Sequence, residues 1–297
     1  MTKSGSLIEF ASAKLNLFLH VTGRRPDGYH DISSLIVFTK FGDRLTARLQ
    51  DRPGGEMRLE IAGPMAGPII SEDNNLVLQA AKILRNSAGN VRPCVDFQLE
   101  KHIPVAAGLG GGSADAAATL RALNQLWQLE FSDHELEALA LPLGADVPVC
   151  IASRASLATG IGETLVPAPQ LPELFLLLVN PGVAVPTPKV FQTLGEIPQI
   201  LEPEIPSGFA DSASFVEFLH TCRNDLEAPA IKIAGVIGDV SKQMRGQPDC
   251  MLARMSGSGA TIFGLFPDKA AGTRAANNIR RSNPTWWVKE TSVPATK

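Results

Sequence analysis

The order of strand and helix signals predicts an α+β protein with two domains. The chain has 297 residues, which exceeds the roughly 100–200 residues of a usual single domain. Alternating apolar residues mark strands, and runs of helical pattern follow in groups rather than in strict strand–helix alternation. A glycine-rich stretch interrupts the first half. We place the domain boundary near residues 151–153, so that 1–152 and 153–297 form the two domains.

Three strands and a turn are expected at the start of the N-terminal half. In KLNLFLHV, residues 14–21, every second residue is Leu or Val, which is the period of a strand. GRRPDGY, residues 23–29, has the Gly, Pro and Asp-Gly content of a turn. Further strands are expected near residues 35–40 and 44–49.

Helices follow in the rest of this half. SEDNNLVLQAAKIL, residues 71–84, places polar starting residues before an apolar stripe, as a capped helix does. VDFQLE, residues 95–100, alternates again and leads as a strand into the glycine stretch. Two helices are expected at 113–129 and 132–141.

The C-terminal half begins with a hydrophobic strand, LFLLLV, at residues 174–179, and continues into the proline-rich turn NPGVAVPTP. Its helices are expected to gather on one face of a sheet. The remaining expected elements are helices at 213–221 and 225–245, strands at 250–256 and 260–266, a helix at 268–281 and a strand at 284–290.

Composition excludes several classes of partner. The formal net charge of -3 has no basic excess for nucleic acid or for an anionic membrane. The longest aliphatic or aromatic run, at 174–179, is far shorter than the ~20 residues that span a bilayer, and the start of the chain lacks the apolar core of a signal peptide. The four cysteines show no C-x-x-C spacing. We expect a cytoplasmic protein without nucleic-acid or membrane partners.

The stretch IPVAAGLGGGSADAAATL, residues 103–120, favours binding of an anion. Four of the five residues from Gly108 to Gly112 are glycine, and each glycine costs about 0.5–1 kcal/mol relative to alanine in ordered structure. Ser113 breaks the G-x-G-x-x-G pattern, and no lysine follows as in a Walker loop. A glycine turn between a strand and a helix start nevertheless presents N–H groups to a phosphate. A flexible loop with Ser113 as helix cap is the alternative.

This stretch resembles the phosphate loop of the GHMP kinases, the superfamily of galactose, homoserine, mevalonate and phosphomevalonate kinases. The resemblance implies an ATP-dependent kinase whose domains are an N-terminal one with a left-handed βαβ unit and a C-terminal ferredoxin-like one, with the active site in the cleft between them. Alanine stands at two positions, 106 and 107, where the family often has glycine. The residues implied to hold the ATP phosphates are Pro104, Val105, Ala106, Ala107, Gly108, Leu109, Gly110, Gly111, Gly112, Ser113 and Ala114.

Six further segments are similar, in chain order, to one branch of this superfamily. That branch phosphorylates the 2-hydroxyl of a cytidine diphosphate sugar-alcohol in the non-mevalonate isoprenoid pathway, and the similarity implies this substrate. The segments are AKLNLFL (13–19), GRRPDGYH (23–30), GADVPV (144–149), NPGVAVPTPKVF (180–191), RNDLE (223–227) and MSGSGAT (255–261).

The resemblance assigns a catalytic pair, Lys14 and Asp146. Without it, Lys14 belongs to a solvated strand face, which Asn16 shares by alternation, and Asp146 to a turn or helix cap. In the family, an aspartate at this position takes or orients the hydroxyl proton, and a lysine holds the aspartate and neutralises the transferring phosphoryl group. Mg²⁺ is expected on the ATP phosphates; Ser113 is the one ligand we name, and we expect no dedicated metal site.

The acceptor residues also come from the resemblance. The family places a cytosine ring between aromatic residues at positions 29 and 191, here Tyr29 and Phe191, with His30 hydrogen-bonded to the edge of the base. Asn16 and Thr187 contact the rest of the acceptor. Without the resemblance, Tyr29 is a turn anchor, His30 a surface imidazole, Thr187 a helix cap and Phe191 a core residue. The adenine is expected near Asn75–Leu76 and Lys101.

Three alternatives remain open at this point. A kinase of the same superfamily acting on a sugar, homoserine or a mevalonate derivative has no need of the aromatic slot. A regulatory nucleotide-binding protein would not need both Lys14 and Asp146, and a purely structural module leaves the glycines unexplained. Both a monomer and a weak homodimer fit the sequence.

Overall fold

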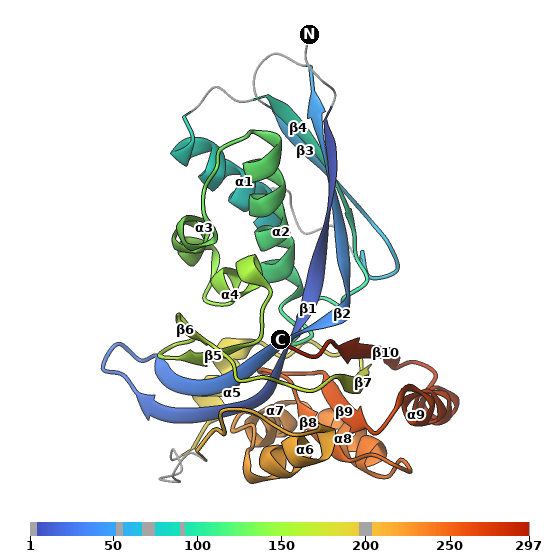
Figure 1. Ribbon diagram of the computed structural model, residues 1–297. Coiled ribbons are helices and arrows are strands. Elements are labelled where there is room, and N and C mark those ends of the chain that lie inside the picture. The colour runs from blue at the N-terminus through green and yellow to red at the C-terminus, as the bar shows by residue number, and fades with distance from the viewer. Residues whose placement is uncertain (1–4, 52–55, 67–74, 90–92, 196–203, 297) are drawn as a thin grey trace. The chain divides into compact units, whose positions relative to one another are not determined.

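A computed structural model describes residues 5–51, 56–66, 75–89, 93–195 and 204–296 (Figure 1). The chain forms two compact units, each discontinuous in sequence, and the domain division expected at residue 152 stays a prediction. The first unit comprises Met1–Ala13, Gly42–Val105 and Gly110–Arg154, and the second comprises Lys14–Phe41, Ala106–Leu109 and Ala155–Lys297. Two long strands, β1 (Ser6–Arg24) and β2 (His30–Gln50), therefore pass through both units.

The first unit contains a parallel strand pair with a helix in its connection. Strands β3 (Met57–Ala62) and β4 (Cys94–Glu100) are parallel, and helix α1 (Leu76–Ser87) lies between them in sequence. Strand β4 also pairs antiparallel with β2, from Arg44 to Gln50. This is the βαβ arrangement that the family resemblance implied; its left hand stays a prediction. Residues 71–74 of the expected first helix lie outside the described residues, and α1 is capped by Asn75.

The two strands expected at 35–40 and 44–49 are one continuous strand, β2, so their separation was wrong. Gly42 lies where the two were thought to part. A Cβ at this position would stand 2.2 Å from the carbonyl oxygen of Ala11. The backbone of β1 thus passes so close that only glycine fits, and this glycine marks a close approach of two strands rather than a turn.

Three more helices belong to the described part of the first unit. They are α2 (Gly111–Leu126), α3 (Asp133–Ala140) and α4 (Val147–Ala152), with a short 3₁₀ turn, Leu141–Leu143, before α4. The expected helices at 113–129 and 132–141 are confirmed with small shifts at their ends. Helix α3 begins with a capping box, in which Ser132 and Glu135 satisfy each other's backbone amides. Helix α4 was not expected, because its six residues are too few to show a helical period.

The second unit contains a four-stranded antiparallel sheet in the order β10-β7-β9-β8. In sequence, β7 (Leu174–Asn180) precedes a group of helices, β8 (Leu252–Met255) and β9 (Ile262–Phe266) form a hairpin, and α9 (Lys269–Ser282) leads to β10 (Trp287–Val293). A strand–helix–strand–strand–helix–strand order with the last strand beside the first is the ferredoxin-like topology. That expectation is confirmed.

Of the helices expected before β8, the one at 213–221 is confirmed and the one at 225–245 is divided in two. The described helices between β7 and β8 are α5 (Thr187–Thr193), α6 (Ser212–Thr221), α7 (Glu227–Ile233) and α8 (Val236–Arg245). The single helix expected at 225–245 was wrong, because Ala234 adopts an extended conformation between α7 and α8. The break lets Ala230 of α7 and Ile237 of α8 both enter the same core.

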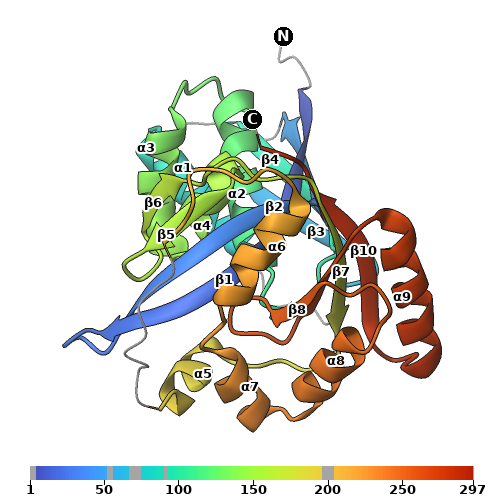
Figure 2. The ribbon, with the colours of Figure 1, turned by 60° about the horizontal axis from the view of Figure 1, so that its bottom comes forward.

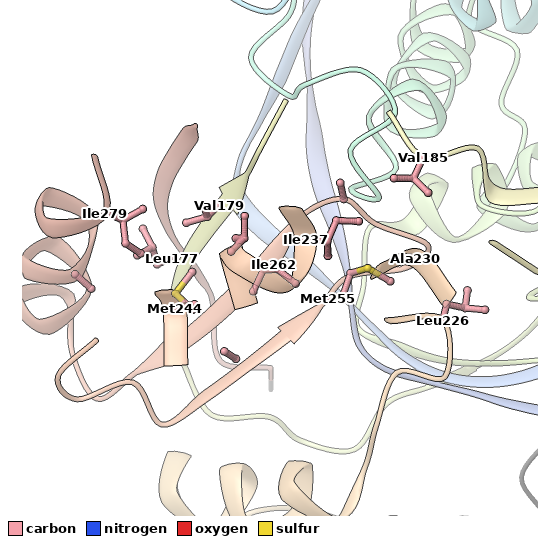
Figure 3. Packing of buried hydrophobic residues seen from close by; sticks show 14 of the residues in the cluster. Leu177, Val179, Val185, Leu226, Ala230, Ile237, Met244, Met255, Ile262 and Ile279 are labelled. Carbon is pink, nitrogen blue, oxygen red and sulfur yellow. The ribbon is translucent and has the colours of Figure 1, made fainter. Parts of the chain in front are cut away.

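That core lies between the sheet and its helices (Figure 3). Leu177 and Val179 of β7 alternate toward it and meet Ile262 of β9, Ile237 of α8 and Ile279 of α9. Figure 2 shows α8 and α9 beside the strands whose residues they cover. Burying each such side chain contributes about 1.5–3 kcal/mol.

Two further short strands in the described part of the second unit were not expected. They are β5 (Ser156–Thr159), which pairs with β2 at Ser34–Ile36, and its hairpin partner β6 (Thr164–Pro167). Four residues are too few to display an alternating pattern. Among the residues that the structure describes, none of the helices combines the length and apolar character needed to cross a bilayer.

Candidate active site

The glycine stretch forms a sharp turn that ends at the start of α2. Gly108 and Gly110 adopt left-handed conformations, with φ values of 73° and 64°, and Gly110 occupies the cap position of the helix. The first amide bonded within the helix is that of Ala114, which donates to the carbonyl of Gly110 at 2.8 Å. The amides before it, at residues 111–113, point out of the helix start, where they suit an anion.

Ser113 is the third residue of α2, so the alternative in which it caps this helix was wrong. Within the described ranges, its hydroxyl makes no hydrogen bond and remains available to a ligand. The same ranges contain no group of three His, Cys, Asp or Glu side chains that could hold a metal ion.

A buried hydroxyl connects β1 to the glycine stretch. The side chain of Ser256 accepts a hydrogen bond from the backbone amide of Asn16 at 3.1 Å and donates one to the carbonyl of Gly108 at 2.9 Å. Beside it, the amide of Lys14 donates to the carbonyl of Leu109 at 2.8 Å. The strand that carries Lys14 and Asn16 is thus linked to the turn expected to hold phosphates at two points, directly through Leu109 and indirectly through Ser256.

Lys14 and Asn16 themselves are 3% exposed each, so the alternative of a solvated strand face was wrong. The Lys14 ammonium donates to the Asn16 side-chain oxygen at 3.1 Å, which confirms that the two share one face. The Asn16 amide donates to the hydroxyl of Ser34 at 2.8 Å. This bond fixes which end of the amide faces the lysine.

Asp146 belongs to the first unit, at the cap position of α4. It is half-buried, and its carboxylate makes no capping hydrogen bond to the helix that follows. The sequence interpretation of Asp146 as a helix cap is therefore right for its backbone and wrong for its side chain.

Among the aromatic residues expected around the acceptor, His30 stacks on Phe191. The rings of His30 and Phe191 stack with centroids 5.2 Å apart and planes 23° from parallel. Tyr29 is 60% exposed, on the turn. Burial, and then the charge of Arg24, lower the pKa of His30, which favours the neutral imidazole. A neutral imidazole can both donate and accept one hydrogen bond.

Thr187 lies in the same unit as this aromatic pair. It is the first residue of α5, and Pro186 holds the cap position, so the cap interpretation of Thr187 was wrong. Its hydroxyl lies 2.7 Å from that of Ser258, in the second glycine turn at 255–261. Phe191 is half-buried rather than a full core residue.

Sequence reasoning missed a buried charged cluster in the first unit. Lys101 donates to the carboxylates of Asp43 and, at 2.6 Å, of Asp115. These residues come from the end of β4, from β2 and from α2, and are 8%, 0% and 4% exposed. No local pattern joins residues so far apart in sequence, although Asp115 next to the glycines offered a weak signal.

Asn224, within the RNDLE segment, was likewise not assigned. Its side-chain amide donates to the carbonyls of Met255 and Gly257, both at 2.8 Å, and its oxygen accepts from the amide of Leu226. Both donors of this buried amide thus bond the second glycine turn, while its oxygen bonds the chain just before α7.

Comparison with known proteins identifies close relatives. The family model of the GHMP kinases N terminal domain matches residues 75–154, and the family model GHMP kinases C terminal matches residues 214–285. A 4-diphosphocytidyl-2-C-methyl-D-erythritol kinase of Cereibacter sphaeroides is 49% identical over 94% of this chain and 96% of its own length. One of Bradyrhizobium diazoefficiens is 46% identical over 97% of this chain and 98% of its own.

Solved structures show the same likeness. A crystal structure of 4-(cytidine 5'-diphospho)-2C-methyl-D-erythritol kinase is 34% identical in sequence and matches with a TM-score of 0.79. The match covers 97% of this chain and 99% of the chain in that structure. A homoserine kinase from Cytophaga hutchinsonii has a TM-score of 0.71 over 99% of this chain and 96% of its own, at 18% identity. The second likeness shows the fold alone.

Two opposite substitutions test the glycine turn. A Cβ on Gly108 would lie 2.5 Å from the carbonyl oxygen of Ser256 and 2.7 Å from that of Gly259, so Gly108→Ala must displace backbone. Ala106 has a left-handed φ of 53°, which costs an L-residue roughly 1–2 kcal/mol. We expect Gly108→Ala to lower the melting temperature and weaken ATP binding, and Ala106→Gly to raise the melting temperature. Thermal unfolding and ATP titration measure both; an unaffected Gly108→Ala protein would contradict the contact.

Proposed function

Because this chain belongs to the 4-diphosphocytidyl-2-C-methyl-D-erythritol kinases of the GHMP superfamily, it is an ATP-dependent small-molecule kinase, and we propose that it phosphorylates the 2-hydroxyl of 4-diphosphocytidyl-2-C-methyl-D-erythritol. The observation that carries this proposal is the glycine turn at the start of α2. Its left-handed glycines and the amides that follow them suit the phosphates of ATP.

Asp146 and Lys14 are the proposed catalytic residues. Phosphoryl transfer passes through a loose transition state, so positioning and charge stabilisation matter more than a strong base. Asp146 would take or orient the proton of the acceptor hydroxyl. Lys14, held at Asn16, would offset negative charge on the transferring group. This division of roles asks little of the basicity of Asp146.

Mg²⁺ is proposed as the companion of ATP. The free hydroxyl of Ser113 at the start of α2 fits as a ligand, since Mg²⁺ prefers oxygen and usually keeps phosphates, water and few protein groups in its shell. When bound, the ion would neutralise phosphate charge. The protein's share of this task is the placement of the amides and of Ser113.

The cytosine of the acceptor is proposed to bind at Tyr29, His30 and Phe191. The stacked pair of His30 and Phe191 already presents aromatic faces, and stacking a base on such a face contributes about 1–3 kcal/mol. The exposed ring of Tyr29 supplies the second face. Neutral His30 would donate or accept at the edge of the base, while Asn16 and Thr187 would contact the remainder.

The wider setting is also a proposal. With a net charge of -3, the protein has no basic excess to attract nucleic acid, and we place it in the cytoplasm as a monomer or weak homodimer. Residues 1–152 would then be the ATP-binding domain and 153–297 the domain that contributes to the substrate site.

A panel of acceptors tests the proposed reaction. ADP release, measured in a coupled assay with ATP and Mg²⁺, should be fast with 4-diphosphocytidyl-2-C-methyl-D-erythritol and near background with mevalonate or homoserine. Mevalonate and homoserine have no base that could bind in the aromatic slot. Faster turnover of either of them would overturn the acceptor assignment while leaving the kinase assignment intact.

Asp146→Asn tests the catalytic role. General-base assistance is worth about 10²–10⁴-fold, so kcat should fall by that factor. The affinity for ATP, measured by calorimetric titration, should stay unchanged. Asp133→Asn, on the exposed end of α3, is the matched control and should retain full activity. Unchanged kcat in Asp146→Asn would remove this residue from the mechanism.

Tyr29→Ala tests the stacking role. It should raise the KM of the acceptor much more than the KM of ATP, because the lost ring contacts only the base. Tyr29→Phe keeps the ring and should restore the acceptor KM. Phe10→Ala, which truncates another exposed aromatic residue, serves as control. Equal changes in both KM values after Tyr29→Ala would count against stacking.

A further inference from the structure

The three charges of the Lys101 cluster lie at both ends of the proposed phosphate loop. Lys101 has been named so far only as a neighbour of the adenine, and Asp43 and Asp115 have been given no role. One oxygen of Asp43 accepts the backbone amides of His102 at 2.5 Å and Ile103 at 2.8 Å, directly before Pro104. The other oxygen accepts from Lys101. Asp43 therefore fixes the segment through which the chain enters the loop.

Lys101 links this entry segment to the far end of the loop. Its ammonium also bonds Asp115, in the first turns of α2, where the chain leaves the loop. Gly111, the first residue of α2, lies directly against the cluster. A Cβ there would stand 3.1 Å from Ile103 and 3.5 Å from the Lys101 nitrogen. One ammonium thus joins both ends of the loop through two carboxylates.

The ammonium of Lys101 cannot be removed without cost, because it offsets the charges of two buried carboxylates. Burial works against the charge of Lys101, but Asp115 and Asp43 outweigh it and raise the pKa of the lysine. Burial, with Asp43 adding to it and Lys101 opposing it, raises the pKa of Asp115 to about 7. One oxygen of Asp115 has no hydrogen-bond partner among the described residues. Without the lysine, two buried carboxylates would face each other.

Stability alone does not account for such an arrangement. Replacing a buried ion cluster by apolar residues is often neutral or stabilising, so its presence is weak evidence of a stabilising role. Its members contact the loop only at the two ends. This pattern suits a device that fixes the loop's span, and phosphoryl transfer depends on that kind of placement.

We propose that Lys101 is a positioning residue of the kinase reaction, which acts through Asp43 and Asp115 to hold the two ends of the phosphate loop at the separation that ATP requires. The inference rests on the proposed function, since the loop's ligand is the triphosphate of ATP. Lys101 does this without touching the reacting atoms.

Lys101→Met tests the proposal, together with a double variant that separates position from charge. Lys101→Met should raise the KM of ATP and lower kcat/KM for ATP by roughly 10–10²-fold, with the acceptor KM unchanged. Lys101→Met/Asp115→Asn removes the excess carboxylate charge along with the lysine. It should recover the melting temperature and keep the deficit in kcat/KM for ATP. Lys40→Met, in an exposed ion pair, is the matched control and should match the wild type.

Recovery of kcat/KM in step with the melting temperature would overturn the proposal, because the cluster would then be merely structural. If Lys101→Met does not fold, the double variant and Asp115→Asn decide between the same outcomes. The calorimetric affinity for ATP needs no acceptor. A wrong acceptor assignment would therefore leave this test valid, whereas an absence of ATP binding to the wild type would mark the failure of the proposed function itself.

Discussion

One buried hydroxyl, that of Ser256, supports the proposed substrate-binding part of the second unit. It is fully buried, and it serves the amide of Asn16 and the carbonyl of Gly108 at the same time. A hydroxyl can do this because it offers both a proton and lone pairs. Without it, two backbone groups would remain unpaired in the interior, at a cost of about 1–3 kcal/mol each. The register between the Lys14 strand and the glycine turn depends on this side chain.

The same contact explains why glycines recur on both sides of it. A Cβ on Gly108 would collide with the carbonyls of Ser256 and Gly259, and one on Gly257 would come within 3.3 Å of Asn16 and of Gly108. The two glycine turns therefore pack so closely that side chains on these glycines would not fit, whether or not a phosphate is bound. Asn224 fixes the second turn by binding the carbonyls of Met255 and Gly257. Glycine content alone is consequently an ambiguous sign of a nucleotide site, and the bonds between the turns resolve part of that ambiguity.

The features that could be predicted from the sequence were those that depend on residues close together along the chain. The strand at 95–100, the helix after Ser132 and the shared face of Lys14 and Asn16 follow from local period and capping, and the structure has all three. The break at Ala234 and the continuity of β2 through Gly42 depend on tertiary neighbours, so local patterns misjudged both. The resemblance grouped His30 and Phe191 around one base, but the stacking of the two rings on each other, between residues far apart in sequence, was not predicted. The resemblance named Lys101 only for the adenine, and Asp43 and Asp115 look like ordinary polar residues until the fold buries them.

The charge of Lys101 is offset where it lies, because its ammonium bonds two carboxylates. A cation whose charge is offset can hold backbone in place but adds little attraction for an anion. For a reaction that spreads negative charge over a transferring group, Lys101 is therefore suited to the loop that places this group rather than to the group itself. The bond from Lys14 to the neutral side-chain oxygen of Asn16 holds Lys14 on its strand, as the catalytic role proposed for it requires.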